Sequence, residues 1–171
     1  MPTKYFPIDA NVDTTCDSVV ADVIGDMSKT QGAGADAVGS TGSSGFTELF
    51  SWDIDVSGDS AGDGDHNCSI NVTAADDAAQ FEYRMRLVAI NDTGCVEELQ
   101  STGTTFTGTG VKTDTLSLTP WSPANRLRLE VWGRKVAVHG NKAMTIRIED
   151  ADTFVDAPWG AAAPQRFFVS S

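Results

Sequence analysis

The sequence predicts an all-β protein, an antiparallel and jelly-roll-like β-sandwich that carries an extended N-terminal arm. From residue 46 onward, apolar and polar side chains alternate with a period of two, which places them on opposite faces of strands. Clusters of Gly, Asn, Asp and Pro interrupt this alternation at the spacing expected between short strands. Residues 28–45 are rich in Gly and contain almost no large apolar side chain, which is typical of a flexible linker.

These patterns divide the chain into two parts. Residues 1–45 are predicted to form the N-terminal arm and linker, and residues 46–171 the β-sandwich domain. The length of 171 residues suits a single domain. We therefore expect deletion of residues 1–45 to leave a folded sandwich that no longer binds its partner.

The first predicted strand of the sandwich spans residues 50–56. Its apolar residues alternate with polar ones, so Trp52 is expected in the core and Asp53 in solvent. The same pattern predicts strands over residues 68–72 and 81–89. The solvent face of the latter strand is expected to carry Glu82, Arg84 and Arg86.

Turn signals connect several of the later strands. Residues 91–94 predict a tight turn that joins residues 81–89 to a returning strand over residues 95–99. The Thr-rich segments 104–109 and 113–119 favour strands because β-branched side chains suit the pleated backbone.

A further hairpin is predicted near the C-terminus. Its strands span residues 127–131 and 144–148, and Gly140 and Asn141 form its turn. The solvent face of its first strand is expected to carry Arg126, Arg128 and Glu130.

Two short strands, residues 153–156 and 166–169, bring the expected number to eight or nine, which fits a jelly roll. Residues 16–27 are compatible with either a short helix or an edge strand.

The net charge of -12 lies in the N-terminal half. Residues 1–80 contain fourteen acidic residues against Lys4 and Lys29 and no arginine. Nucleic acid would be repelled by this half, because affinity for phosphates comes from Lys and Arg. The acidity suits either solubility alone or the steering of a basic partner.

The cysteines are predicted to be reduced. Cys16, Cys68 and Cys95 show no C-x-x-C spacing, and their odd number leaves at least one thiol unpaired. We expect all of them to be reduced and structural. The first ten residues lack the pattern of a signal peptide, and no run of about 18 apolar residues occurs, so we expect no membrane partner.

The histidines do not predict a catalytic site. His66 and His139 lie in or beside predicted turns, and neither has a set of further ligands or partners at a recognisable spacing. We interpret both as exposed loop residues. The sequence therefore predicts a non-enzymatic protein with no catalytic residue and no cofactor.

Acidic residues and tryptophans supply the weaker site candidates. Asp59, Asp63 and Asp65 lie in a Gly-rich loop that could offer oxygen ligands to Ca²⁺. The loop lacks the distal Glu of an EF-hand, and we interpret it as a solvated turn without a metal. Trp121 and Trp159 lie in Pro-containing loops and are the partner-binding candidates, either for sugar rings or for subunit contacts.

Three stretches, residues 84–96, 125–132 and 144–158, resemble small β-sandwich structural proteins of tailed bacteriophages. The first is similar to their strand-turn-strand with a polar N-x-x-G turn, and the second to a strand that opens with a polar residue and Arg-Leu. The third is similar to their closing strand and its Phe-Val-x-x-Pro exit. Asn125 replaces the usual Asp, and residues 149–152 replace a Phe-x-Gly segment.

The resemblance implies a virion structural protein that is assembled in the host cytoplasm. Together with the arm, it suggests a capsid decoration or cement protein that binds the major capsid protein or other virion proteins. A homo-oligomer, either a trimer or a dimer, is expected because most oligomers have closed symmetry. The alternative is a carbohydrate-binding β-sandwich module of a phage tail, fibre or baseplate.

Overall fold

The computed structural model describes residues 3–57, 64–91, 93–119, 126–136 and 140–158 of the chain. The described residues form eleven strands and no helix, so the all-β prediction is confirmed. No helix in this part of the chain is therefore long and apolar enough to cross a membrane. The strands are β1 (Thr3–Pro7), β2 (Val23–Ser28), β3 (Ala35–Thr41), β4 (Thr47–Asp55), β5 (Gly64–Ala75), β6 (Phe81–Asn91), β7 (Val96–Thr102), β8 (Gly110–Leu118), β9 (Arg126–Lys135), β10 (Lys142–Ile148) and β11 (Phe154–Ala157).

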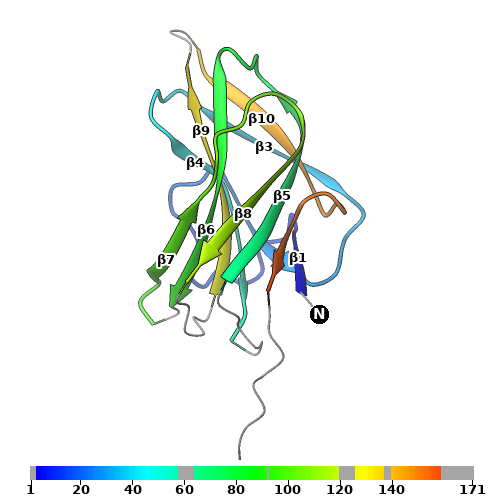
Figure 1. The fold of residues 1–171 in the computed structure, drawn as a ribbon, viewed down its shortest axis with the longest axis vertical. Coiled ribbons are helices and arrows are strands. Elements are labelled where there is room, and N and C mark those ends of the chain that lie inside the picture. Colours follow the sequence, from blue (N-terminus) through cyan, green and yellow to red (C-terminus); the bar gives the residue numbers. More distant parts are fainter. Residues whose placement is uncertain (1–2, 58–63, 92, 120–125, 137–139, 159–171) are drawn as a thin grey trace, which may run out of the picture.

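All eleven strands belong to one hydrogen-bonded sheet (Figure 1). Its order is β3-β10-β5-β11-β1-β2-β4-β9-β6-β7, and β8 pairs with β5 outside this path. The β2–β4 pair is parallel, whereas the other strand pairs are antiparallel.

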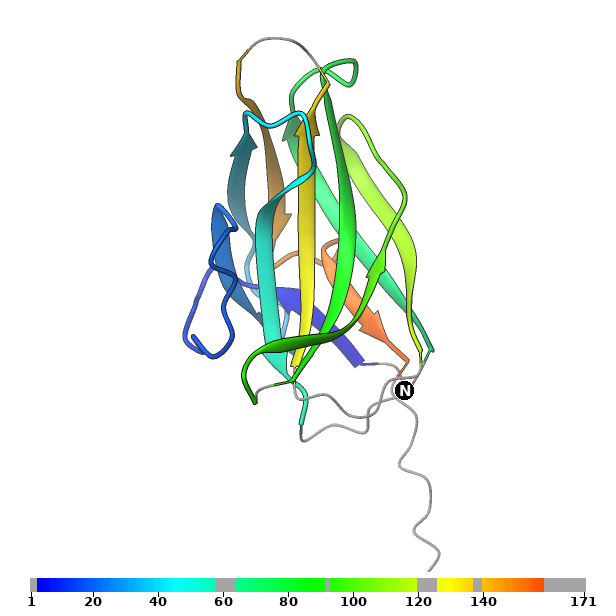
Figure 2. The ribbon, with the colours of Figure 1, turned by 90° about the vertical axis from the view of Figure 1, so that its left-hand side faces the viewer.

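The sheet bends at β1, which pairs with β11 through residues 3–5 and with β2 through residues 6–7. As a result, β4, β9 and β6 run side by side in front of the other half in Figure 2. The two halves meet closely where a Cβ on Gly39 of β3 would lie 2.9 Å from Cζ of Phe50 on β4. Both halves therefore contribute to one core.

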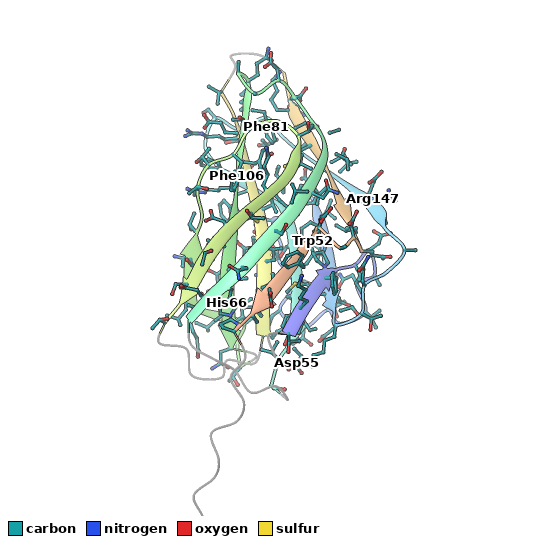
Figure 3. All side chains as sticks on the ribbon, turned by 45° about the vertical axis from the view of Figure 1, so that its right-hand side comes forward. Trp52, Asp55, His66, Phe81, Phe106 and Arg147 are labelled. Atoms are coloured by element: carbon teal, nitrogen blue, oxygen red, sulfur yellow. A yellow bond between two sulfur atoms is a disulfide. The ribbon has the colours of Figure 1, made fainter. Side chains whose placement is uncertain are left out.

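The core is apolar and contains buried aromatic and aliphatic side chains from both halves. Trp52 is fully buried and stacks on Phe50 with ring centroids 5.3 Å apart, which confirms the predicted register of this strand (Figure 3). Trp52 is also paired in register with Leu129 of β9. Burial of such side chains supplies most of the driving force for folding.

One local prediction is confirmed, and another is corrected. The turn after β6 has Gly94 at φ 84°, and it leads into the β6–β7 hairpin. Residues 16–27 form neither the helix nor the edge strand considered for them, because they contain the start of β2, which lies inside the sheet between β1 and β4.

The structure does not confirm the N-terminal arm predicted for residues 1–45. Three strands, β1, β2 and β3, lie in this region and pair within the sheet. The small residues of β3 have a packing role, since Gly39 lies where its strand crosses β4. Low side-chain volume here reflects close packing between the two halves rather than flexibility.

The predicted hairpin around residues 140–141 is wrong. β9 pairs with β4 and β6, whereas β10 pairs with β3 and β5, so the chain passes from one half of the sheet to the other. Within residues 104–109, Phe106 forms an isolated bridge with Tyr83 in place of a strand. The predicted strand at residues 166–169 lies outside the described residues.

Candidate functional site

The most elaborate polar structure in the described chain lies beneath the segment that connects β1 to β2. We call this segment, residues 8–22, the β1–β2 loop. Backbone hydrogen bonds hold its start against β2, from Ile8 N to Asp26 O at 2.9 Å and from Asp26 N to Ala10 O at 2.8 Å. The Asp26 carboxylate also accepts hydrogen bonds from Val12 N at 2.7 Å and Asp13 N at 3.2 Å.

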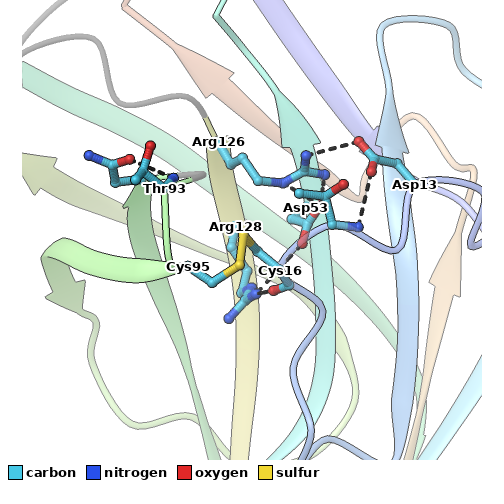
Figure 4. Close-up of a disulfide and its surroundings, with 9 residues drawn as sticks. Asp13, Cys16, Asp53, Thr93, Cys95, Arg126 and Arg128 are labelled. Carbon is cyan, nitrogen blue, oxygen red and sulfur yellow. Dashed lines mark hydrogen bonds and ion pairs between the residues drawn. A yellow bond between two sulfur atoms is a disulfide. The ribbon is translucent and has the colours of Figure 1, made fainter.

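A disulfide between Cys16 and Cys95 fixes the middle of the loop (Figure 4). It connects the loop to the β6–β7 turn across 79 residues of sequence. The prediction that these two cysteines are reduced is therefore wrong, because folding brings together positions that are remote in sequence. Cys68 is free and buried, which confirms that one thiol remains unpaired.

Buried charges lie directly beneath the disulfide. Arg126, which is 2% exposed, donates to Asp53 from Nη2 at 2.5 Å and from Nε at 3.2 Å. Its Nη1 donates to Asp13 of the loop at 2.9 Å. Arg128 donates to the Cys16 carbonyl and lies 3.6 Å from Asp53, so both arginines hold the loop on β4 and β9 (Figure 4).

This charge network continues across β9 toward β7. Glu130 lies 2.7 Å from Nη1 of Arg86 on β6 and 3.7 Å from Arg128. Arg86 also pairs with Glu97 of β7 at 2.6 Å. Trp132 Nε1 donates to Glu130 at 2.7 Å, so this carboxylate is fully engaged inside the network.

The solvent exposure predicted for several of these side chains is wrong. The buried members of this face include Ser51, Asp53, Arg126, Arg128 and Glu130. The alternation of apolar and polar residues assigns the side chains of β4 and β9 to the correct faces. It does not reveal that the β1–β2 loop covers the polar face of these strands. The usable sequence signal was charge complementarity, since Asp53 and Arg128 are register partners on β4 and β9.

The pKa directions within the network follow from burial and pairing. Burial raises the pKa of Asp53 and outweighs its hydrogen bonds from Arg126. Burial acts to lower the pKa of Arg126, but its bonds to Asp53 and Asp13 outweigh burial and raise it. Nη2 and Nε of Arg126 both donate to Oδ1 of Asp53, and charge-assisted hydrogen bonds of this kind favour the ionised pair.

The loop carries three exposed valines among polar residues, even though buried charges hold it to the sheet. Val12, Val19 and Val20 are 84%, 94% and 67% exposed, and Val96 beside the disulfide is also exposed. When a partner covers apolar side chains of this kind, the burial stabilises the complex. The β1–β2 loop is therefore a candidate partner-binding element.

A separate depression of about 440 Å³ lies on the outer face of the other half of the sheet. Half-buried Phe154 of β11 forms part of its wall, and Lys4 Nζ lies 3.8 Å from the centroid of the Phe154 ring. Its remaining lining residues are Asn67, Cys68, Ser69, Thr113, Asp114 and Thr115. An aromatic ring beside hydroxyl and amide groups suits a sugar ring.

The sites predicted from sequence are placed only in part. Asp59, Asp63, Trp121, Trp159 and His139 lie outside the described residues. Asp65 is an exposed residue of β5, and the described chain holds no group of three side chains that could bind a metal ion.

His66 differs from the exposed loop residue that the sequence predicted. It is fully buried on β5, and its Nδ1 lies 3.0 Å from the Gly64 carbonyl (Figure 3). Burial lowers the pKa of His66, which keeps the ring neutral.

Comparison with protein-family models finds no match to this chain, and a search of curated proteins also finds none.

Proposed function

We propose that this protein is a non-enzymatic virion structural protein of the capsid decoration or cement type. In this proposal its folded sheet is a jelly-roll-like sandwich, and the β1–β2 loop binds the outer shell formed by the major capsid protein. The observation that carries the proposal is the contrast between the two sides of this loop. Its underside is covalently and ionically fixed, whereas its valines face solvent.

Fixing an apolar loop before binding favours association. A free loop loses about 1 to 2 kcal/mol of backbone entropy per residue when it is ordered. The Asp13–Arg126 pair and the hydrogen bonds from Val12 N and Asp13 N to Asp26 order the loop during folding instead, so a partner need only cover the valines. This arrangement suits a protein whose role is to bind tightly to another surface.

The disulfide is consistent with a virion protein for a second reason. Disulfides persist on virion surfaces but are rare in the reducing cytosol. We propose that the chain is assembled on the shell in the host cytoplasm and that Cys16 and Cys95 become joined once particles reach an oxidising medium. The copies on the shell would form a closed trimer or dimer.

Co-sedimentation with empty shells tests the proposed function. The double variant Val19→Asp and Val20→Asp places charges on the apolar surface of the loop, and we expect shell binding to be lost. The control is Val111→Asp, which alters an exposed valine on β8 in the other half of the sheet. Equal binding by both variants and the native chain would contradict the role of the loop.

The depression beside Phe154 supports a second candidate function, a carbohydrate-binding module of a tail, fibre or baseplate. On this proposal the Phe154 ring contacts a sugar and the neighbouring hydroxyl and amide groups fix its orientation. A glycan array distinguishes the candidates: binding that disappears in Phe154→Ala favours the module. Binding that disappears instead in Trp121→Ala or Trp159→Ala assigns sugar recognition to the Pro-containing loops.

A further inference from the structure

The β1–β2 loop is attached to the sheet by polar contacts at both of its ends. Near its start, two backbone N–H groups donate to the Asp26 carboxylate at 2.7 and 3.2 Å, and Asp13 pairs with Arg126 at 2.9 Å. At its end, the Asp22 carboxylate accepts a hydrogen bond from Ser40 N at 2.8 Å. These contacts hold the two ends of the loop without a covalent bond.

The part between these ends, residues 14–21, carries two of the exposed valines, and we call it the valine-bearing part. Its attachment runs mainly through Cys16, which forms the disulfide with Cys95 (Figure 4). The Cys16 carbonyl also accepts a hydrogen bond from Arg128. Ser18, which is buried, adds a side-chain hydrogen bond with a residue of β4. The disulfide is therefore the covalent component of this attachment.

Both residues of the disulfide have an unfavourable backbone conformation. Cys16 has φ 65° and Cys95 has φ 53°, and they are two of the three non-glycine residues with positive φ in the described chain. A residue with a Cβ adopts this left-handed region at a cost in free energy and stays there when its surroundings impose it. Breaking the disulfide releases this constraint, and relaxation of Cys16 would reorient the carbonyl that Arg128 binds.

The disulfide is accessible to a dissolved thiol. Cys95 lies exposed in the β6–β7 turn, whereas Cys16 is half-buried. The third cysteine, Cys68, is buried, and burial raises the pKa of its thiol. Cys68 is thereby kept protonated and away from solvent, so it does not take part in thiol exchange. Attack from solvent is therefore expected at the sulfur of Cys95.

We propose that the Cys16–Cys95 disulfide is a reducible clamp on the valine-bearing part of the β1–β2 loop. A small thiol such as glutathione attacks Sγ of Cys95 and forms a new sulfur–sulfur bond with it. The bond between Cys95 and Cys16 breaks, and its electron pair stays on Cys16 Sγ, which takes up a proton from water. A second thiol then attacks the sulfur of the first and releases Cys95 as a thiol. Two thiols are thus oxidised to their disulfide while the protein disulfide is reduced.

Reduction changes how the valine-bearing part is held. The hydrogen bonds of Cys16 and Ser18 remain to hold it on the sheet, so it opens locally more often while the two ends of the loop stay attached. The clamp is a property of the loop and goes beyond the proposed function. Where that function is assumed, the clamp deepens it, because a reducing medium then loosens the surface that contacts the shell.

Limited proteolysis of the full chain tests the clamp. The protease is subtilisin, which has broad specificity and contains no cysteine, and mass spectrometry maps the cuts and confirms the state of the thiols. Cleavage of a folded protein tracks the population of its opened form, so we expect cuts within residues 14–21 to form at least about tenfold faster after reduction with glutathione. β4 and β9 should stay uncut over the same period.

Two cysteine variants separate the clamp from other effects of the thiol. Cys95→Ser removes the bond without altering the loop, so its residues 14–21 should be cut at the raised rate in the absence of glutathione. Cys68→Ala is the matched control, since it removes the buried free thiol and keeps the bond, and it should be cut as slowly as the oxidised native chain. Equal cleavage of the oxidised and reduced chains would overturn the clamp. Cuts that appear in β4 and β9 as fast as in the loop would also overturn it, because they indicate global unfolding.

The outcomes separate the clamp from the proposed function. If reduction accelerates cleavage of the loop, and the Val19 and Val20 variant sediments with shells as the native chain does, the clamp stands and the shell is the wrong partner. If reduction leaves cleavage unchanged, and the Val19 and Val20 variant no longer sediments with shells, the loop binds the shell and the clamp is wrong.

Discussion

Arg126 and Asp53 form a nearly fully buried ion pair beneath the β1–β2 loop. Arg126 also pairs with Asp13 of this loop. Burying both charges is costly, so their net contribution to stability is small while the pair is intact. Removing one partner is different, because it leaves the other charge buried without compensation. Loss of either partner is therefore expected to destabilise the packing of the loop on the sheet.

We predict that Asp53→Ala lowers the free energy of unfolding by about 3 to 5 kcal/mol, the cost of an uncompensated buried charge. Urea denaturation at neutral pH measures this difference. Asp36→Ala removes a partner from the exposed pair with Arg147 and should change stability by less than about 1 kcal/mol. Similar effects of the two variants would contradict the burial of the network.

Glu48 provides a test of the same network through pH. Burial, followed by repulsion from Glu130, raises the pKa of Glu48 above its usual 4.5. The folded state therefore binds a proton more readily than the unfolded state, so ionised Glu48 destabilises the fold at neutral pH. One of its carboxylate oxygens, Oε1, is also buried without a donor among the described residues.

We predict that Glu48→Gln stabilises the protein by about 1 kcal/mol at neutral pH, the lower end of the cost of an unsatisfied buried group. The gain should be fully present above the raised pKa of Glu48 and should fall to zero as pH drops through this pKa toward 4.5. Denaturation curves at several pH values measure it. A gain that does not change with pH would show that the charge of Glu48 is not responsible.

At the scale of elements, β3 depends on close contact with β4. A Cβ added to Gly39 would lie 2.9 Å from Phe50 Cζ and 3.1 Å from Leu49 Cβ. We predict that Gly39→Ala lowers the free energy of unfolding by about 1 to 3 kcal/mol, the usual cost of overpacking. Gly45→Ala, at an exposed position with a nearest neighbour at 3.7 Å, should have no such effect in the same thermal melts. Equal stability of both variants would indicate that β3 does not pack on β4.

The Cys16–Cys95 disulfide joins two elements that no backbone ladder connects. By closing 79 residues of chain it should stabilise the fold by about 4 to 5 kcal/mol through the entropy of the unfolded state. We predict that the double variant Cys16→Ser and Cys95→Ser loses this stability in urea denaturation. Reduction of the native chain with dithiothreitol should give the same loss, and no loss in either experiment would contradict the bond.

Local patterns predicted some elements of this fold, and non-local contacts decided the rest. The β6–β7 hairpin was predictable because its alternation and its turn at Gly94 lie within one continuous stretch. β3 was missed because a strand made of small residues has the composition of a linker. The burial of Arg126 and Arg128 was missed because the loop that covers them lies more than 100 residues away in sequence.

For the whole molecule, the N-terminal region is part of the sheet rather than an addition to it. β1 is the single described strand that connects the two halves, and β3 covers part of the core. We therefore predict that deleting residues 1–45 abolishes cooperative unfolding, in contrast to the expectation from sequence that a folded domain would remain. Circular dichroism melts of the truncated chain measure this, and a cooperative transition near that of the full chain would contradict the integrated fold.

The distribution of charge adds a further property at this scale. The net charge of -12 favours solubility and gives long-range attraction to basic surfaces, which salt weakens. Apolar contact by Val19 and Val20 would be far less sensitive to salt. In the proposed complex the β1–β2 loop would combine electrostatic steering with an apolar contact.

A cryo-electron microscopy reconstruction of shells decorated with the native chain would show directly which face of the protein meets the shell. We propose that this contact is formed by the β1–β2 loop. We expect residues 8–22 to lie at the interface, with Val19 and Val20 covered by the shell protein. A reconstruction in which these valines face solvent while another face of the sheet meets the shell would contradict it.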